Sequence, residues 1–374
     1  MPLKRSFGAV AGQAGGAPFV GTAAPTSVLA ATSSHGESMC AAAAAAEVPG
    51  LGTGAGGSEY DAEKDAVGSW MKLTVAAVVV ICLFVLVRNG LRMVERRMLF
   101  PGTNKPAPFA AALKGSDAAR FVRLGVKSYT APQDDGAPPV RYFAVFPSEP
   151  PSSCAGSVVV LHGNNCTAAD CIMDMVPTLT SVNVAVFLVE YPGYASDPSN
   201  TKPSECAILD NAVRVIDHLT LSRHAPWDKP VMLLGQSLGC AVAMHVAHKR
   251  PKVVHSLFLL SPFTSVADVV ATRVSHFPFK WFIKSNFDTG AWVRNVVCPV
   301  TIAHGSSDMD VPLHLGEKLA AQFAVKPTFV LVDRGGHHDM LAAHGDKVWP
   351  ACTRAVEAAA EFKAVMDDMA TGVQ

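Results

Sequence analysis

Nearly continuous apolar runs recur along the C-terminal part of the chain. They cover residues 158–163, 184–191, 231–235, 255–262, 300–305 and 328–333. Strands that helices cover on both faces of a parallel sheet have this appearance. Helical patterns lie between them, over residues 205–219, 238–249, 312–323 and 349–369. The alternation predicts a doubly wound α/β domain over about residues 95–374. Residues 121–129 and 140–146 are candidates for a leading, antiparallel pair of strands.

The longest apolar run precedes this domain. Residues 73–87 carry no charge, and counting back to Gly68 gives about the 20 residues that span a bilayer. Lys72 can extend to the interface beside Trp70. A helix buried in a soluble domain normally has a polar stripe, and this segment has none. We therefore predict one transmembrane helix at residues 68–90, with the membrane lipid bilayer as its partner.

The flanking charges indicate the orientation of this span. The arginines just after it are Arg88, Arg92, Arg96 and Arg97. Only Lys64 and Lys72 lie close before its apolar part, so the positive-inside rule predicts that the α/β domain is cytosolic. Ahead of the span, residues 1–67 are rich in Ala, Gly, Ser, Pro and Thr. We expect them to be disordered, because they have too little bulky apolar surface to offset the entropy of ordering.

Composition narrows the possible partners. The 374 residues have a formal net charge of +0, which gives no basic footprint for nucleic acid. The 9 cysteines include no CxxC pair, so a reducing compartment is the simpler interpretation. Residues 52–57 fit GxGxxG in form only, because no strand precedes them. His245 and His248 lack the HExxH pattern of a zinc site. We expect neither a cofactor nor a metal.

The motif GQSLG at residues 235–239 lies where a predicted buried strand ends and a helix begins. A nucleophile elbow needs this place, because its turn lifts a serine hydroxyl clear of the sheet. The turn is so tight that its flanking positions have no room for side chains, which explains the glycines. The helix N-terminus also points at the reacting centre. Ser237 is therefore the candidate nucleophile.

A serine nucleophile needs a base, and the base needs an acid that fixes its tautomer. His337 and His338 follow the last predicted strand on a loop with two glycines, and Asp308 and Asp310 follow an earlier strand. We favour His337, directly after the glycines, as the base. We favour Asp308 as the acid, because Asp310 lies close to a proline that can begin the next helix. The chain order Ser237, Asp308, His337 is that of the α/β-hydrolase fold.

Two donors are expected to form an oxyanion hole. One is the backbone N–H of Leu238, directly after the nucleophile, and the other is Asn164, in the loop after the strand at residues 158–163. We expect His162 to brace this loop by hydrogen bonding. Residues 263–296, rich in aromatic and aliphatic side chains, lie between two predicted strands and are expected to form a small cap over the site.

These motifs together resemble a known family. The strings are LHGNN, EYPGYASDPSNTKPSE, GQSLG, SPFTS, CPVTIAHGSSDMDVP and GGHHD. From Met98 to the C-terminal helix, the chain is similar to membrane-anchored α/β-hydrolases of the BEM46 and ABHD13/ABHD17 type. The resemblance implies a mostly parallel sheet flanked by helices, with Ser237, Asp308 and His337 on the family's triad positions. It also implies hydrolysis of esters or thioesters, and the ABHD17 branch removes palmitate from S-acylated proteins.

We therefore expect a membrane-anchored serine hydrolase that cleaves acyl ester or thioester bonds. One alternative is a serine peptidase of the prolyl-oligopeptidase-like (S9) class, with which such sequences are often grouped. The N-terminal zone has no blade repeat of the propeller that usually filters the substrates of those peptidases. The other alternative is a non-catalytic membrane adaptor on a hydrolase fold, and the intact triad residues argue against it.

Overall fold

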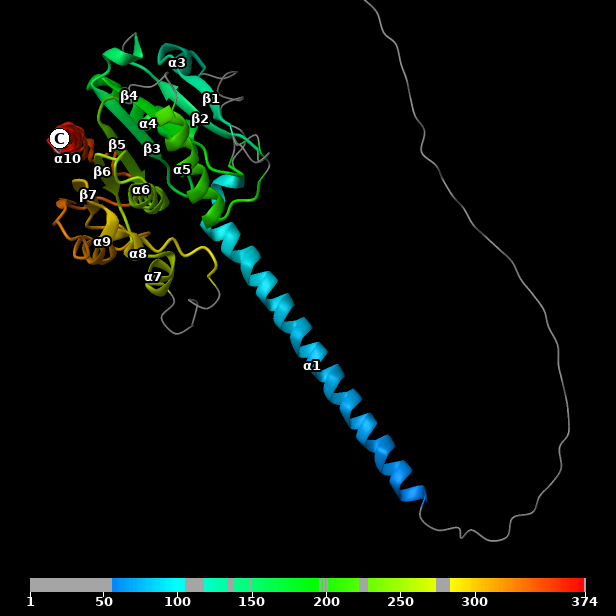
Figure 1. Ribbon diagram of the computed structural model, residues 1–374. Coiled ribbons are helices and arrows are strands. Elements are labelled where there is room, and N and C mark those ends of the chain that lie inside the picture. Colours follow the sequence, from blue (N-terminus) through cyan, green and yellow to red (C-terminus); the bar gives the residue numbers. More distant parts are fainter. Residues whose placement is uncertain are drawn as a thin grey trace, which may run out of the picture. The chain divides into compact units, whose positions relative to one another are not determined.

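The computed structural model describes residues 56–104, 118–132, 138–147, 150–194, 197, 199, 201–221, 228–273 and 283–372. Its helices (Figure 1) are α1 (Gly56–Leu99), α3 (Ala118–Arg123), α4 (Ala168–Ser181), α5 (Glu205–Leu221), α6 (Leu238–Lys249), α7 (Val266–Ala271), α8 (Thr289–Trp292), α9 (Leu313–Ala320) and α10 (Gly345–Thr371). Short 3-10 helices are η1 (Pro101–Asn104), η2 (Pro151–Ser153) and η4 (Val293–Asn295). The strands are β1 (Lys127–Ala131), β2 (Val140–Val145), β3 (Gly156–Leu161), β4 (Val184–Val189), β5 (Val231–Gln236), β6 (Ser256–Leu260), β7 (Val300–Gly305) and β8 (Thr328–Val332).

The 8 strands form one sheet in the order β1-β2-β4-β3-β5-β6-β7-β8. β2 pairs antiparallel with both β1 and β4, and the other neighbours are parallel. The predicted mostly parallel α/β-hydrolase sheet is confirmed. The order changes direction at β3, because β4 pairs with one edge of β3 and β5, the next strand in the chain, pairs with the other. Ligands of open α/β sheets bind outside the carboxyl ends of the strands at such a switch point.

Successive residues of the central strands belong to two different cores. Val159 and Leu161 of β3 lie in the core that includes residues of α5 and α6, whereas Val158 and Val160 lie in the core that includes residues of α4 and α10. Both faces of the sheet are therefore buried, which explains why the strands read as continuous apolar runs. On one face, the hydroxyl of Ser256 donates to the carbonyl of Ala355 at 2.8 Å and joins β6 to α10.

Helix α1 is longer than the span that the sequence predicts. Figure 1 shows one continuous helix, and its bounds, Gly56–Leu99, exceed residues 68–90 at both ends. Good helix formers such as Glu63, Lys64 and Ala66 extend its start. Residues 56–67 are therefore helical, which corrects the expected disorder for that stretch, whereas residues 1–55 lie outside the described residues. Residues 63–99 are long and apolar enough to cross a membrane, with a mean hydropathy of 2.6 in the most apolar window.

The start of the domain differs from the predicted pair of strands. Residues 118–123 form α3, which buries Phe121 against the sheet, so this part of the predicted strand 121–129 is helical. Gly125 has φ +63°, a left-handed conformation that glycine adopts without cost and that ends the turn after α3. Strand β1 therefore begins only at Lys127, and it pairs antiparallel with β2 as expected.

Helix α4 was not among the predicted helices. Pro177 lies inside it, and a proline within an apolar pattern argues against a helix. Its start nevertheless carries a clear signal. The hydroxyl of Thr167 accepts the N–H of Asp170, and the carboxylate of Asp170 accepts the N–H of Thr167, which forms a capping box. Thr167 and Asp170 are the residues from which the sequence could have predicted this helix.

A substitution of Phe258 tests how much the central sheet contributes to stability. Its side chain is fully buried on β6, where it pairs with Leu234 and Thr301 of the neighbouring strands. We expect Phe258→Ala to lower the free energy of unfolding by about 3–5 kcal/mol, because it removes buried area and leaves a cavity. Urea unfolding of the full chain in detergent micelles measures this. Val325→Ala, at a 77% exposed position, is the control and should change the free energy by less than about 0.5 kcal/mol.

Candidate active site

Ser237 occupies a strained turn between β5 and α6. Its backbone has φ +52° and ψ −115°, in a region that residues other than glycine rarely adopt. A Cβ on Gly235 would lie 2.6 Å from the Cα of Cys240, and a Cβ on Gly239 would lie 1.9 Å from the carbonyl oxygen of Leu161. Both glycines are therefore required by the close approach of backbone to backbone. This is the tight turn that the sequence predicts.

The loop after β3 runs directly beside this turn. A Cβ on Gly163 would lie 3.6 Å from the Cβ of Ser237, in ordinary contact. Leu238 is the first residue of α6, so its backbone N–H has no acceptor within the helix. Leu238, Asn164 and Ser237 line the same cavity. The two predicted oxyanion donors and the serine are thus brought to one place, and the donor role itself stays a prediction.

Tyrosines hold this loop in position. The hydroxyl of Tyr191 donates to the carbonyl of His162 at 3.0 Å, and the hydroxyl of Tyr194 donates to the carbonyl of Asn164 at 2.9 Å. The backbone N–H of Gly102 donates to the same Asn164 carbonyl at 3.2 Å. These contacts fix the backbone around Asn164 from two directions. The EYPGY string contains both tyrosines, but their part in the site could not be read from the sequence.

His162 lies beneath the loop as the expected brace. Its Nδ1 is 2.9 Å from the carbonyl oxygen of Gly163, and its ring packs on that of Tyr191 with centroids 3.9 Å apart. Its Nε2 lies 3.3 Å from the carboxylate of Glu190, and both side chains are buried. The Glu190 oxygens have no hydrogen-bond partner among the described residues, so this contact with the His162 ring is the polar contact recorded for the buried carboxylate. Nothing in its sequence pattern assigns Glu190 to the site.

His337 and Asp308 form a buried pair. The Nδ1 of His337 is 2.8 Å from Oδ2 of Asp308, whose side chain is fully buried. Oδ1 of Asp308 accepts the backbone N–H groups of Asp310 at 3.0 Å and Val311 at 2.7 Å. Burial raises the pKa of Asp308, but the hydrogen bond from His337 and those from the backbone outweigh it, and the net pKa is below its ordinary value. An Nδ1–H that donates to this carboxylate leaves Nε2 as an acceptor.

The second histidine and the second aspartate pair with each other at the surface. Nε2 of His338 lies 2.9 Å from Oδ2 of Asp310, and Arg273 lies 2.9 Å from the other carboxylate oxygen. His338 is 72% exposed and Asp310 is 44% exposed. The two neighbouring candidates are thus separated by burial: the pair favoured from the sequence is buried, and the alternative pair is solvated.

His304 lies next to Asp308 and was not identified from the sequence. Its side chain is fully buried, its Nε2 is 2.9 Å from the carbonyl oxygen of Val311, and it lies 3.7 Å from Oδ2 of Asp308. Burial lowers the pKa of His304, so the ring is neutral at physiological pH. A neutral imidazole leaves the charge of Asp308 to be balanced by His337 and the backbone N–H groups.

Ser237 and His337 line one cavity of about 570 Å³. Within the described segments, no hydrogen bond joins the two side chains. Such a bond is often long in a free enzyme and tightens when the substrate binds. Most of the lining is apolar: Leu91, Val94 and Met98 come from α1, and Val266, Val269 and Val270 from α7. Of the predicted cap region, α7 contributes to the lining of this cavity.

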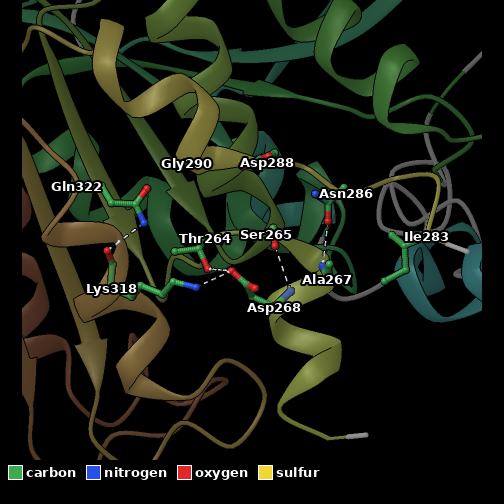
Figure 2. Close-up of a pocket in the computed structure, with 10 residues that line it drawn as sticks. All are labelled: Thr264, Ser265, Ala267, Asp268, Ile283, Asn286, Asp288, Gly290, Lys318 and Gln322. Carbon is green, nitrogen blue, oxygen red and sulfur yellow. Dashed lines mark hydrogen bonds and ion pairs between the residues drawn. The ribbon is translucent and has the colours of Figure 1, made fainter. Parts of the chain in front are cut away.

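A second, polar cavity of about 460 Å³ is lined by Ala267 and Asp268 of α7, among others (Figure 2). Figure 2 shows Lys318 directed at Asp268, 3.1 Å away, and the Thr264 hydroxyl directed at the same carboxylate. Ser265 accepts the N–H of Asp268, and Asn286 accepts the N–H of Ala267. These bonds cap the start of α7 and tie it to the segment after residue 283.

The two histidines of α6, His245 and His248, lie among packed rings. The rings of His245 and His248 are 6.4 Å apart, and the ring of Trp292 lies edge-on to His245 at 4.8 Å. Burial, with a smaller contribution from the charge of Lys249, lowers the pKa of His245 to about 4. Among the residues that the structure describes, no group of three or more metal-ligating side chains occurs.

Parts of the chain are similar to known proteins. Residues 152–288 match the family described as Serine aminopeptidase, S33 (Hydrolase_4). An uncharacterized protein of Mycobacterium tuberculosis is 31% identical over 194 residues, which are 50% of this chain and 66% of that protein. Protein bem46 of Schizosaccharomyces pombe is 30% identical over 140 residues, which are 36% of this chain and 44% of that protein. The chain therefore matches about two thirds or less of these relatives' length.

Solved structures show the same fold. The Pyrococcus furiosus esterase Pf2001 has a TM-score of 0.53 to this chain at 11% identity, over 66% of this chain and 96% of the esterase. At this identity, the similarity concerns the fold alone. The chain therefore has the α/β-hydrolase fold, and its residues 152–288 match one family of such hydrolases.

Proposed function

We propose that this protein is a membrane-anchored serine hydrolase that cleaves acyl ester or thioester bonds, with S-acylated proteins such as palmitoyl-proteins among its substrates. One observation carries the proposal. Ser237, on a strained turn, and His337, paired with the buried Asp308, line the same apolar cavity. A nucleophile, a base and an orienting acid in this chain order are the requirements of acyl transfer on this fold.

The proposed reaction has two steps. The Oγ of Ser237 attacks the acyl carbonyl while Nε2 of His337 takes the hydroxyl proton, and the N–H groups at Leu238 and Asn164 stabilise the oxyanion. The bond from the carbonyl carbon to the leaving oxygen or sulfur breaks, and His337 passes the proton to that atom. Water then attacks the acyl-Ser237 ester with His337 as base, which releases the carboxylic acid and restores Ser237.

Helix α1 supports the anchor. Its large side chains from residue 67 to 98 are exposed and mainly apolar, and a helix that is apolar all round needs a lipid or protein partner. Residues 73–87, without charge, would lie in the hydrocarbon core. The arginines at 88, 92, 96 and 97 follow this stretch, and by the positive-inside rule they favour a hydrolase domain on the cytosolic side.

A serine peptidase is the second candidate, because the matched family is described as Serine aminopeptidase, S33. An aminopeptidase needs a free carboxylate that binds the substrate's α-amino group. The carboxylates that line the cavity already have partners. Glu95 accepts the backbone N–H groups of Lys284 and Ser285, and Asp310 is paired with Arg273 and His338. This arrangement favours acyl substrates over peptides.

Covalent labelling tests the nucleophile. We expect a fluorophosphonate probe to label the full chain in membranes and to give no labelling of Ser237→Ala, because only an activated serine reacts. Gel fluorescence measures the labelling. Equal labelling of wild type and Ser237→Ala would move the nucleophile elsewhere, and no labelling of either would favour a non-catalytic adaptor. If the protein cleaves proline peptides efficiently and does not cleave thioesters, a serine peptidase would become the favoured function over an acyl ester or thioester hydrolase.

Matched aspartate variants test the acid. We expect Asp308→Asn to lower kcat by about 10⁴, because the amide no longer holds the imidazole in its working tautomer. Asp310→Asn should lower kcat by less than about tenfold, since a solvated ion pair contributes little. Turnover of a thioester reporter by detergent-solubilised full chain measures both. The opposite ranking would assign the acid to Asp310 and the base to His338.

Protease protection tests the orientation. In sealed microsomal vesicles with their cytosolic face outward, added trypsin should degrade the hydrolase domain without detergent, because the positive-inside rule predicts that it lies outside the vesicle. Immunoblotting with an antibody to the C-terminal helix measures the loss. A lumenal marker should survive until detergent is added. A domain protected in the same way as this marker would mean the opposite orientation.

A further inference from the structure

One wall of the catalytic cavity is formed by the end of the apolar helix α1. Leu91, Val94 and Met98 line the cavity, and their spacing of three and four residues places them on one face of the helix. Arg92, Met93 and Arg97, on other faces, do not line it. The last turns of α1 therefore present an apolar stripe to the cavity that contains Ser237.

Polar contacts attach this wall to the hydrolase domain. One carboxylate oxygen of Glu95 accepts the backbone N–H groups of Lys284 at 2.9 Å and Ser285 at 2.7 Å. Phe100, directly after α1, is 1% exposed and packs edge-on against Phe287. Gly102 then donates to the carbonyl of Asn164 in the oxyanion loop. The apolar face of α1 is thus fixed with respect to the reacting groups.

Helix α7 lines the same cavity as α1. Its valines Val266, Val269 and Val270 contribute apolar surface, and Ile283 contributes more. Of the polar groups in the lining, Glu95 lies on α1 itself, with one carboxylate oxygen bound by the backbone N–H groups of Lys284 and Ser285. Arg273, Asp310 and His338 form one ion-paired cluster beside His337. The cavity therefore has an apolar part between α1 and α7 and a polar part on the side of His338, with Ser237 and His337 in the same lining.

The apolar part begins close to the proposed membrane surface. With residues 73–87 in the hydrocarbon, Leu91 lies four residues beyond Val87, about 6 Å along the helix, and Val94 lies about 10 Å beyond it. The headgroup layer on each side of a bilayer is about 5–8 Å thick. Leu91 and Val94 are therefore at the level where lipid headgroups end.

We propose that the groove between α1 and α7 binds the acyl chain of a substrate whose chain is embedded in the same bilayer, with Val94 in the wall that the chain contacts. This inference rests on the proposed hydrolase function. The acyl chain would leave the lipid along the stripe of Leu91, Val94 and Met98, and its carbonyl would reach Ser237. The leaving group, a thiol or an alcohol, would exit on the polar side of Arg273 and His338. The cavity, about 570 Å³, is within the usual range for small-molecule sites, about 300–1,000 Å³.

Val94→Trp tests the groove, with Met93→Trp as the matched control. Both positions are more than half exposed, 53% and 56%, so neither substitution disturbs a core. Each methylene that is removed from water contributes about fourfold to binding, so a side chain that excludes a few methylenes should have a large effect. We expect Val94→Trp to lower the ratio of kcat/KM for a 16-carbon to that for a 4-carbon acyl thioester by about tenfold or more. Met93→Trp should leave this ratio unchanged.

The outcomes separate the inference from the proposed function. An unchanged ratio in Val94→Trp, or equal changes in both variants, would overturn the groove while wild-type hydrolysis still supports the enzyme. Absence of wild-type hydrolysis and of fluorophosphonate labelling would overturn the enzyme itself, and the groove with it. If Val94→Trp fails to fold, as judged by the loss of labelling at Ser237, the smaller Val94→Phe is measured in the same way, with Met93→Phe as its control.

A second arm identifies the source of the acyl chain. Full chain is reconstituted into phosphatidylcholine vesicles, and a palmitoyl-thioester peptide is placed in the same vesicles or in separate ones. Faster cleavage within the same vesicles, by about tenfold or more, is expected for entry from the bilayer. Equal rates would mean that the acyl chain reaches the groove from water and would overturn the membrane source.

Discussion

The candidate site depends on the buried carboxylate of Asp308. An ionised group with no exposed surface is tolerated only when its charge is compensated. Here the compensation comes from His337 on one oxygen and from the N–H groups of Asp310 and Val311 on the other. Because His304 beside it is neutral, His337 is the only side chain of these that can add positive charge. The hydrogen bond that stabilises the carboxylate of Asp308 therefore also orients the imidazole of His337 toward the cavity.

Much of this architecture could be predicted, because it is encoded by local patterns. The central strands are apolar on both faces, and the GQSLG turn requires its two glycines for steric reasons. The choice between Asp308 and Asp310 could be argued from the helix that follows. Helix α4 has a proline, Pro177, which weakens its helical pattern, and the predicted strand at Phe121 is helical, with the turn at Gly125 before β1.

The rest arises from contacts between distant segments. In the sequence, Glu190 is part of an apolar run, and only the fold shows that it lies beside His162. Likewise, only the fold shows that the hydroxyl of Tyr194 bonds to the carbonyl of Asn164. The greatest difference between the sequence prediction and the structure concerns α1. Its sequence predicts a membrane span, but nothing in its pattern indicates that Leu91, Val94 and Met98 form a wall beside Ser237. Such pairings depend on tertiary structure, which periodicity does not report.

The junction after α1 has a mechanical consequence. Helix α1 ends at Leu99 and η1 begins at Pro101, so a single buried residue, Phe100, separates them. A flexible tether would let the domain sweep through a volume of solvent, with a reach that grows with its length. A stiff junction gives no such reach. With α1 in a bilayer, as proposed, the domain would meet its substrates by diffusion in two dimensions, at one fixed height above the lipid.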